Sequence, residues 1–401
     1  MKVMKFGGSS VQDAERIKGV CRIIIEENRK EPAVAVLSAM RGITDLLIST
    51  AKKAEQGDLT YKAELEEIIG RHTKVLAELI GNEGRAAAMK GLDLFFDELK
   101  SVLHGIELVR ECSPRSLDLV MSFGERLNCF LAASFITSIG QPAEFVDARS
   151  MIVTDSRFGN AVVDMKESAK KIREVLDRVK GIPIVTGFIA STREGVTTTI
   201  GRNGSDYTAT IIGNALDATV VEIWKDVDGV LTANPKYVKE AFVLPEITFQ
   251  DAIEMSYFGA EVIHPYTTLP AIEKNIPIRI KNTFNPSAPG TLISANGKKT
   301  NRPITGIASI DNVALINIEG SGMIGTPGMA SRVFVALARE GVNIIMISQA
   351  SSEHSICLVM REGEVAHALR RLETDLKEDI ELKRIQRFDL KKGLEIVAVI
   401  G

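Results

Sequence analysis

Lys5 and the glycines that follow it are the first residues of the chain suited to chemistry. The segment Lys5–Ser10 (KFGGSS) ends an apolar run and precedes an amphipathic stretch, so backbone N–H groups and a helix N-terminus can approach an anion closely. Lys5 adds a point charge suited to a phosphoryl group in transfer. The segment is neither a Walker A motif nor GxGxxG, and alone such a turn is structural about half the time.

A richer glycine turn lies at residues 197–209 (TTTIGRNGSDYTA). A run of threonines, typical of a strand, leads through glycines into a predicted helix, which again offers backbone donors at a helix N-terminus. Arg202 brings a guanidinium that can form a bidentate pair with a carboxylate, and Asp206 places an acid beside it. A second anion-binding turn of this richness favours a functional role over a purely structural one.

Three other segments carry polar residues after predicted strands or at a helix start: LSAMRGITD (37–45), SFGER (122–126) and WKDVDGVLTANPK (224–236). The first follows a parallel strand, at the edge where such sheets bind ligands. Taken singly, Ser38 and Thr44 are more typical of helix caps. A lone Glu125 at a helix start is ordinarily a dipole partner, and an Asp-Gly pair is a routine turn.

The elements that must position these segments alternate between strands and helices. Short runs rich in Val and Ile predict strands, and the longer segments between them have helical periodicity, which is typical of an α/β sandwich with a mostly parallel sheet. From Thr44 to Val109 the pattern is almost wholly helical and predicts a helical excursion, packed as a lid or shoulder. The predicted strands are Val3–Phe6, Ala33–Leu37, Ile182–Phe188, Ala218–Trp224 and Ile276–Lys281.

A second unit follows a turn-rich stretch at 285–302. We divide the chain into a first domain at 1–290, a linker at 291–312, a second domain at 313–389 and, at 390–401, the first strand of a further, incomplete unit. The second domain has the βαββαβ order of a ferredoxin-like unit. Its predicted elements are strands at 313–318, 344–349, 355–360 and 380–387 and helices at 327–340 and 364–376, followed by a strand at 395–400.

Composition narrows the class of protein. With 401 residues the chain exceeds the usual size of one core, and 49 Lys and Arg against 52 Asp and Glu give no basic excess for nucleic acid or a membrane surface. The four cysteines lack CxxC spacing, and no apolar run reaches the ~18 residues of a membrane span. The five histidines are dispersed, which argues against a catalytic zinc. We predict a cytoplasmic protein without nucleic-acid or membrane partners.

Taken together, these motifs resemble those of the aspartate kinases of the amino-acid kinase superfamily, and the resemblance covers the whole chain. Five segments match in order across about 260 residues, which makes chance agreement negligible. They are KFGGSS (5–10), SFGERL (122–127), GRNGSDYTA (201–209), WKDVDGVLTANP (224–235) and YFGAEVIHP (257–265). The resemblance implies an amino-acid-kinase-type three-layer sandwich, in which the first domain phosphorylates the side-chain carboxylate of L-aspartate.

The resemblance also implies roles for individual residues. Lys5 and Asp206 are the implied catalytic pair, with Lys5 stabilising the charge that develops during transfer and Asp206 orienting the lysine or the metal shell. ATP is the implied co-substrate, with Mg²⁺ held mainly by phosphate oxygens and water. The implied aspartate site is Ser38, Thr44, Glu125, Arg202 and Ser205. The implied ATP site is Lys5, Phe6, Gly7, Gly8, Ser9, Lys225, Asp226, Leu231, Lys236, Glu261 and Val262.

The chemistry of aspartate agrees with such a site. Its β-carboxylate has an ordinary pKa near 3.9 and is already an ionised nucleophile at neutral pH, so no general base is required. The protein must instead bring two anions together, which explains lysine, arginine, glycine N–H groups and helix N-termini in one place.

The second domain resembles an ACT domain, a βαββαβ module that often binds amino acids. Its Asn343, Ile344 and Gln349 lie in segments similar to those of threonine-sensitive members, so threonine is a more probable effector than lysine, and the ACT region implies a homodimer or higher oligomer. The alternative is a plain dimerisation module. Since such proteins usually carry two ACT units, we expect the chain to be truncated or part of a longer kinase, such as a kinase-dehydrogenase fusion.

Two departures and two alternatives remain. Asn203 and Glu261 stand where the family usually has glycine and lysine, and Asn tolerates left-handed backbone geometry better than most residues. The alternative enzyme is another amino-acid kinase, acting on glutamate, acetylglutamate or a nucleotide. The alternative outside catalysis is an amino-acid sensor that has lost kinase activity.

Overall fold

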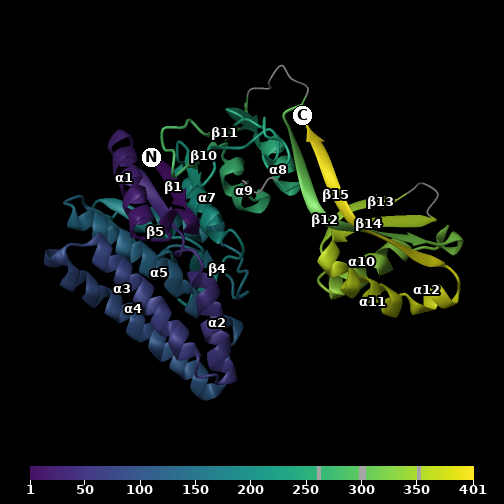
Figure 1. Cartoon of the computed structure of the whole chain (residues 1–401), viewed down its shortest axis with the longest axis horizontal. Helices are drawn as coiled ribbons and strands as arrows, with labels where there is room; N and C mark the ends of the chain where they lie inside the picture. Colours follow the sequence, from purple (N-terminus) through teal and green to yellow (C-terminus); the bar gives the residue numbers. More distant parts are fainter. Residues whose placement is uncertain (260–262, 298–303, 350–353) are drawn as a thin grey trace. The chain divides into compact units, whose positions relative to one another are not determined.

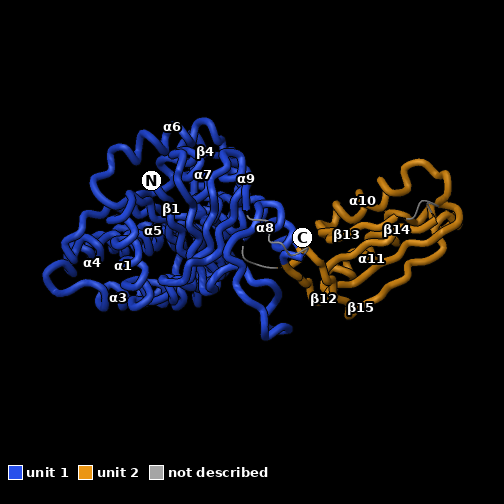
Figure 2. The backbone as a smooth tube through the Cα atoms, turned by 90° about the horizontal axis from the view of Figure 1, so that it is seen from above, with its two compact units in different colours: residues 1–257, 261–305, 401 blue, residues 258–260, 306–400 orange. Residues whose placement is uncertain are grey.

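The computed structural model describes residues 1–259, 263–297, 304–349 and 354–401. The chain forms two compact units (Figures 1 and 2). Unit 1 comprises residues 1–257, 261–305 and 401, and unit 2 comprises residues 258–260 and 306–400. The segment predicted as a linker, 291–312, therefore contains a strand of unit 1 and the first part of a strand of unit 2.

Within the described residues, unit 1 is built on a sheet of eight strands in the order β3-β5-β2-β1-β8-β10-β11-β9. Neighbouring strands run parallel except at the β10–β11 pair, which is antiparallel. The central strands are buried on both faces, as expected for apolar runs in a covered parallel sheet. The strands are β1 Lys2–Phe6, β2 Ala33–Leu37, β3 Ala143–Val146, β5 Ile182–Thr186, β8 Val221–Lys225, β9 Glu246–Thr248, β10 Ile278–Asn282 and β11 Thr291–Ser294.

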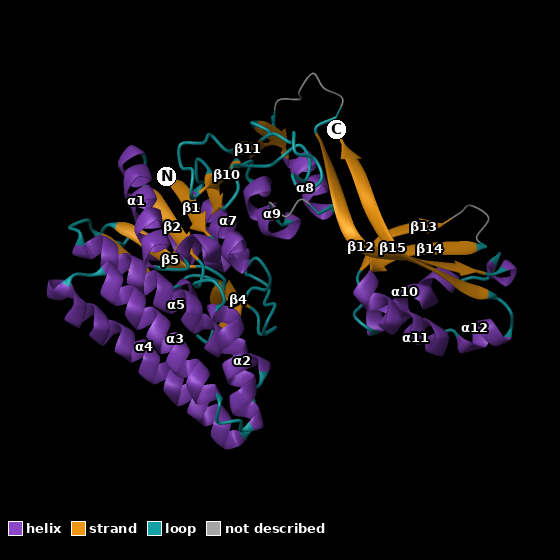
Figure 3. Cartoon of the chain, viewed as in Figure 1, coloured by secondary structure: helices purple, strands orange, loops and turns teal. Residues whose placement is uncertain are grey.

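Helices α1 and α5 pack on the sheet face that carries Met4 and Phe6, and α2, α3 and α4 pack in turn against α5 (Figure 3). Asp13 caps α1 by accepting from the backbone N–H of Arg16, and Ser113 caps α5, which has Pro114 in its first turn. The long helical excursion predicted from Thr44 is thus confirmed, and its apolar residues join the main core rather than a separate one. The helices are α1 Ala14–Lys30, α2 Ile43–Gln56, α3 Tyr61–Leu79, α4 Asn82–Val109 and α5 Pro114–Ser138.

Helix α5 is also long and apolar enough, by length and composition alone, to cross a membrane. In the described structure 83% of its most apolar window is buried inside the protein. This burial is the pattern of a helix at the centre of a folded core, so the composition of α5 is weak evidence for a membrane span.

The opposite face of the large sheet is covered by helices that follow later strands, chiefly α7, which packs against β1, α6 and α9. A separate sheet of described residues, in the order β4-β6-β7, leads into α7. The two helical layers and the sheet between them form the predicted three-layer sandwich. The elements are α6 Met165–Leu176, α7 Gly204–Leu216, α8 Phe249–Tyr257, α9 Pro265–Glu273, β4 Val153–Thr154, β6 Ile189–Thr192 and β7 Thr197–Thr199.

Unit 2 has the predicted βαββαβ order. Its described strands form an antiparallel sheet in the order β13-β14-β12-β15, and α10 and α11 bury their apolar faces against it. The long pair β12–β15 is interrupted by register shifts between Ile310 and Leu315. The elements are β12 Gly306–Glu319, α10 Met329–Arg339, β13 Ile344–Gln349, β14 Ser355–Arg361, α11 Val365–Asp375, α12 Lys377–Glu381 and β15 Arg387–Ile400.

One predicted strand, at 380–387, is wrong. These residues alternate apolar and polar side chains, but they begin in the short helix α12 and continue through a turn. The buried carboxylate of Asp379 explains the difference, because it pairs with Arg332 at 3.0 Å and with Arg384 at 3.1 Å. Tertiary ion pairs therefore override a local period of two. Residues 390–400, expected as a separate strand, lie within β15 and pair with β12.

Candidate active site

The carboxyl ends of β1, β2 and β8 meet at one edge of the large sheet, because the three strands are parallel neighbours. At this edge lie Lys5, near the end of β1, Ser38, directly after β2, and Lys225, at the end of β8. The chain leaves β1 toward β2 on one side and later returns to β8 on the other. Ligands of open α/β sheets bind at such a switch point.

Gly7 and Gly8 allow a close approach of backbone segments at this edge. A Cβ atom added to Gly8 would lie 2.9 Å from the carbonyl oxygen of Ala39, and one added to Gly7 would lie 3.4 Å from Nζ of Lys5. A side chain at position 8 would thus push the turn away from the loop after β2. The glycines keep backbone amides next to Lys5, as a phosphate cradle requires.

Lys5 and Asp206 form a buried ion pair, with 2.5 Å between Nζ and Oδ1. Both side chains are about nine-tenths buried. Burial alone would raise the pKa of Asp206, but the positive charges of Lys5 and Lys225 outweigh it, so that the pKa lies below its ordinary value. The carboxylate of Asp206 therefore holds the Lys5 side chain in place at the carboxyl end of β1.

The turn before Asp206 has the left-handed backbone that its sequence implies. Gly201 has φ +81° and Asn203 has φ 56°, and α7 begins at the next residue, Gly204. The prediction that asparagine would tolerate left-handed geometry at position 203 is confirmed. This turn presents Arg202 and places Ser205 and Asp206 in the first turn of α7, at a helix N-terminus, whose dipole favours an anion.

Glu125 is a buried carboxylate on the middle of α5, not at a helix start as its sequence suggested. A Cβ atom at the preceding Gly124 would lie 2.8 Å from Cβ of Ala39, so glycine lets α5 pack directly on the loop after β2. Glu125 is 3% exposed, and its Oε2 atom has no hydrogen-bond partner among the described residues. Burial raises its pKa to about 8, although backbone hydrogen bonds and the charge of Lys5 oppose the shift.

These groups line one hollow of about 330 Å³. It brings together Lys5 and Gly8 of the predicted phosphate site and all five residues of the predicted aspartate site: Ser38, Thr44, Glu125, Arg202 and Ser205. Arg41 and Asp45, which the sequence reasoning did not select, line it as well. A basic residue in the glycine turn after β2 was the available signal for Arg41.

The other described residues of the predicted nucleotide site do not line this hollow. Gly7 and Ser9 belong to the turn after β1, whereas the Phe6 side chain is buried and stacks on Trp224 at 5.5 Å, which leaves only its backbone for a ligand. In the described part of the chain, Asp226, Leu231 and Lys236 lie in the loop after β8, outside the hollow. Glu261 and Val262 fall outside the described residues.

Sequence reasoning missed two residues that fix the loops of this site. Asp118, fully buried near the start of α5, accepts hydrogen bonds from the backbone N–H of Gly159 at 2.9 Å and from both the N–H and the hydroxyl of Thr199, at 2.9 and 2.8 Å. Thr199 lies three residues before Arg202. Asn128 donates to the carbonyl of Ser38 at 2.6 Å. Nothing in the sequence distinguishes these polar residues from others on an apolar helix.

Two sequence models match the chain. The model of the amino acid kinase family matches residues 1–282, and that of an ACT domain matches residues 316–376. A crystal structure of E. coli aspartokinase III in complex with lysine and aspartate superimposes with a TM-score of 0.84, at 32% sequence identity, over 100% of this chain and 87% of that chain.

The chain belongs to the aspartokinases of the amino acid kinase family. A second structure of E. coli aspartokinase III, in complex with aspartate and ADP, has a TM-score of 0.81 at 31% identity over the same shares of both chains. The bifunctional aspartokinase/homoserine dehydrogenase 2 of Arabidopsis thaliana, a chloroplastic protein, is 38% identical over 406 residues. The match includes 100% of this chain but only 44% of the length of that relative.

The ACT domain of this aspartokinase contains a second hollow of about 330 Å³, lined in part by Met323, Thr326, Gly328 and Gln349. The predicted regulatory residues are not all brought together in the described chain. Gln349 lines the hollow at the end of β13, but Ile344 begins that strand and Asn343 precedes it, which places them about 17 and about 20 Å away at 3.3 Å per residue.

Proposed function

We propose that this chain is an aspartate kinase that transfers the γ-phosphoryl group of ATP to the side-chain carboxylate of L-aspartate, giving 4-phospho-L-aspartate and ADP. This is the reaction that opens lysine, threonine and methionine biosynthesis. The observation that carries the proposal is the single hollow in which Lys5, Glu125 and Arg202 converge. Relatives of known structure bind aspartate and, in one case, ADP, which supports both substrates.

Glu125 and Arg202 are suited to the two charged groups of the amino-acid backbone. The ammonium of aspartate would donate a hydrogen bond to Oε2 of Glu125, a buried oxygen without a described partner. The α-carboxylate would pair with the guanidinium of Arg202, which can hold it through two hydrogen bonds. With both ends fixed, the β-carboxylate is directed toward Lys5, which lines the same hollow. Orientation of this kind lowers the barrier by removing rotational freedom.

The transfer itself needs charge stabilisation more than acid or base chemistry. A β-carboxylate oxygen, already ionised, forms a bond to the γ-phosphorus while the bond to the β–γ bridging oxygen breaks and its electrons leave with ADP. Lys5 neutralises the negative charge that spreads over the γ-phosphoryl oxygens, and Asp206 holds the lysine in position. The glycine turn after β1 brings backbone N–H groups to the same oxygens.

Mg²⁺ would supply further neutralisation of the triphosphate. Among the described residues, no group of three or more histidine, cysteine or carboxylate side chains is arranged to hold a metal ion. Phosphate oxygens and water would therefore supply most of its ligands. Asp206, with its lowered pKa, is the carboxylate of the described site best placed to orient the metal's water shell.

The ACT domain would regulate this activity by binding an amino acid in its hollow. The hollow lies at the N-terminus of α10, which begins after Gly328 in left-handed geometry without a side-chain cap, so its backbone N–H groups can hold an α-carboxylate. All described residues that line it are uncharged. An uncharged lining favours threonine over lysine, whose side-chain ammonium would lose its hydration without a carboxylate in exchange. The expected oligomer and cytoplasmic location stay predictions.

The test is a coupled assay of ADP release with Mg-ATP and aspartate, glutamate or acetylglutamate as acceptor, using the 401-residue chain. We expect turnover with aspartate that exceeds turnover with the other acceptors. Turnover only with another acceptor would replace the proposed substrate. No turnover, in a chain that still binds threonine by calorimetry, would support a sensor that lacks kinase activity.

A further inference from the structure

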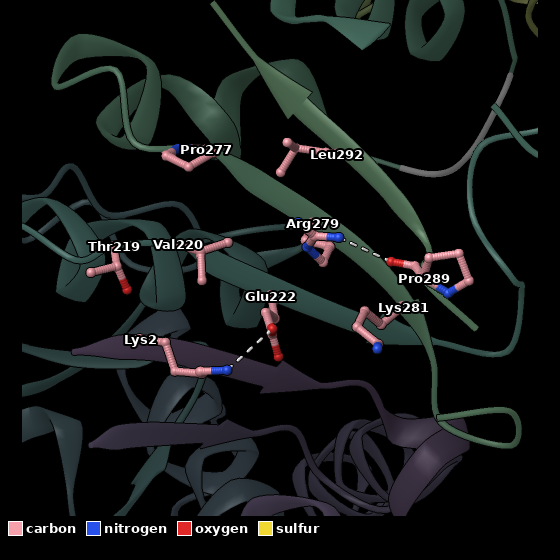
Figure 4. A pocket seen from close by; sticks show the side chains of 9 residues that line it. All are labelled: Lys2, Thr219, Val220, Glu222, Pro277, Arg279, Lys281, Pro289 and Leu292. Carbon is pink, nitrogen blue, oxygen red and sulfur yellow. Dashed lines mark hydrogen bonds and ion pairs between the residues drawn. The ribbon is translucent and has the colours of Figure 1, made fainter. Parts of the chain in front are cut away.

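A hollow of about 470 Å³ opens on the large sheet, and none of its described lining residues belongs to the hollow beside Lys5. Its floor is formed by β1, β8, β10 and β11 (Figure 4). Strand register places Glu222, Arg279 and Leu292 in one row with Met4, on the face that α1 and α5 cover elsewhere. Here, charged side chains replace the apolar ones found under the helices.

The charges in this hollow are unevenly matched. The charge of Lys2 is balanced by two carboxylates, because its Nζ lies 2.6 Å from Glu27 and 3.6 Å from Glu222. Arg279 and Lys281 project from the same face of β10 and, within the described residues, have no carboxylate within ion-pair distance. At 3.3 Å per residue their backbones are about 7 Å apart. The floor therefore presents two neighbouring cations that no described carboxylate pairs directly, although Glu222 lies in the same row as Arg279.

Both cations are held by neutral groups of one turn. Arg279 donates to the carbonyl oxygen of Pro289 at 3.1 Å, and Lys281 donates to that of Pro286 at 3.0 Å (Figure 4 shows the first of these bonds). Lys281 also lies over the ring of Trp224, at 5.0 Å from its centroid. Partial burial lowers the pKa of Lys281, and the charge of Arg279 adds to the shift, while Glu222 opposes it. An anion would relieve this repulsion.

The turn that holds the two cations also contacts the segments around the proposed nucleotide site. The Thr283 hydroxyl lies 2.8 Å from that of Ser10, and Arg16 of α1 lies over the ring of Phe284 at 4.7 Å. Asn282 and Asn285 both donate to Asp228 in the loop after β8, at 2.9 and 3.1 Å. Residues 282–290 thus connect the hollow with the turn after β1 and the loop after β8.

We propose that Arg279 and Lys281 form a second anion site, which takes a small dianion carrying phosphate or two carboxylates, and that its occupancy alters nucleotide binding through residues 282–290. The dianion would replace the carbonyls of Pro286 and Pro289 as the partner of the two cations, because a charged acceptor binds more strongly than a neutral one. The released turn would then shift its contacts with Ser10 and Asp228. The link to nucleotide binding rests on the proposed kinase function, whereas anion binding does not.

The competing interpretation is a hydrated sheet face, since polar residues commonly cover the open side of a sheet. Three features favour the anion site: the cations converge in a hollow rather than spreading over a surface, each is only partly exposed, and both share one turn. A hydrated face would show no saturable response to anions.

Trp224 is a built-in reporter, because it is the chain's single tryptophan. Its indole N–H donates to Glu222 at 3.1 Å, and Lys281 lies over its ring. We would titrate the full chain with inorganic phosphate and, separately, with succinate, following the indole resonance of ¹⁵N-labelled protein. We expect a saturable shift with at least one of them, and the tighter of the two identifies the class of ligand.

The variant Arg279→Gln/Lys281→Gln should weaken this response by about tenfold or more, as expected for lost charge-assisted hydrogen bonds. The matched control, Lys170→Gln on an exposed face of α6, should leave it unchanged, and the shift should persist in Lys5→Ala, which disables the other phosphate site. A linear response, or equal saturation in the double variant, would overturn the site. In the ADP assay the double variant should change KM for ATP and its dependence on phosphate; unchanged values with intact binding would remove only the coupling.

Discussion

The hollow beside Lys5 and the hollow of the ACT domain have the same volume, about 330 Å³, but opposite chemistry. The hollow beside Lys5 is built from buried charges, and one of them, Glu125, is held at a pKa far above its ordinary value. The hollow of the ACT domain is lined by uncharged described residues around a glycine turn and a helix N-terminus. The volume of a hollow therefore does not indicate which ligand it binds. The charge and burial of the lining residues are more informative.

On the proposed function, this difference separates a site that acts on its ligand from a site that only holds one. Burying a charge without a full set of partners reduces stability, and the structure does so in the hollow where we propose a reaction that needs a strong local field. A regulatory site needs only selective binding, which backbone groups supply without such a penalty. We expect substitutions in the first hollow to have large effects on catalysis. Such a substitution should lower stability where it leaves a buried charge without its partner and raise stability where it removes one. Substitutions in the second hollow should have modest effects on both catalysis and stability.

The largest effect is expected for Lys5→Ala. If Lys5 has the proposed role, removing it takes away a charge next to the transferred phosphoryl group, so kcat should fall by about 10²–10³-fold. Asp206 would be left buried without its closest cation, and the melting temperature should also fall. The control is Lys90→Ala on an exposed part of α4. A near-normal kcat in the ADP assay would contradict the assignment of Lys5.

The next largest effect is expected for Glu125→Gln on aspartate binding. Losing the carboxylate that we propose faces the ammonium should raise KM for aspartate by roughly 30-fold, about 2 kcal/mol, with less change in KM for ATP. In the unaltered chain, KM for aspartate should fall as pH rises toward 8, because the pKa of Glu125 is raised to about 8 and only the ionised form pairs with an ammonium. The variant should lack this pH dependence; retention of it would assign the titration to another group.

The same substitution should stabilise the protein, which sharpens the contrast between function and stability. The pKa of Glu125 is raised from 4.5 to about 8 by folding, so between these pH values the folded state binds more protons than the unfolded state. Stability is then lost as pH rises through this window. Glu125→Gln should match the unaltered chain near pH 4.5 and exceed it at pH 8 in urea unfolding. Parallel stability curves would contradict the buried, protonated carboxyl.

A smaller effect is expected for Asp118→Asn, which acts on Arg202 only through Thr199. All three hydrogen bonds at Asp118 are donated to it, and an asparagine would turn an N–H₂ group toward at least one of these donors. KM for aspartate should rise by about tenfold while kcat changes little. Asp93→Asn, exposed on α4, is the control. An unchanged KM would show that the β7–α7 turn is held by other contacts.

The sequence predicted the charged hollow better than the neutral one, for a physical reason. Lys5 and Ser38 lie at the carboxyl ends of two neighbouring parallel strands, which must meet at one edge of the sheet, so their convergence follows from topology alone. The position of Glu125 in the middle of α5 was not predicted, because it depends on how Gly124 packs against Ala39. Asp118 and Asn128 were missed because hydrogen bonds across the fold leave no local pattern.

In the ACT domain the sequence pattern predicted most of the helices and strands, but it did not predict which residues come into contact. The bounds of β13 agree with the predicted strand, and yet its two ends separate Asn343 from Gln349. The predicted strand at 380–387 fails for the same kind of reason, since the ion pairs of Asp379 with Arg332 and Arg384 join residues up to 47 positions apart. Long-range polar contacts are what a pattern of apolar residues leaves out.

The smallest effect is expected for Gln349→Ala, which tests whether the neutral hollow is the effector site. The amide of Gln349 can donate to and accept from a bound amino acid, and one neutral hydrogen bond contributes about 0.5–1.5 kcal/mol. The concentration of threonine for half-inhibition should therefore rise by roughly 3- to 10-fold, with kcat unchanged in its absence. Gln250→Ala, exposed on α8, is the matched control. Unchanged inhibition in Gln349→Ala would place the effector site elsewhere. Stronger inhibition by lysine than by threonine would require a charged partner that the described lining lacks. Either outcome would contradict the contrast between the two hollows.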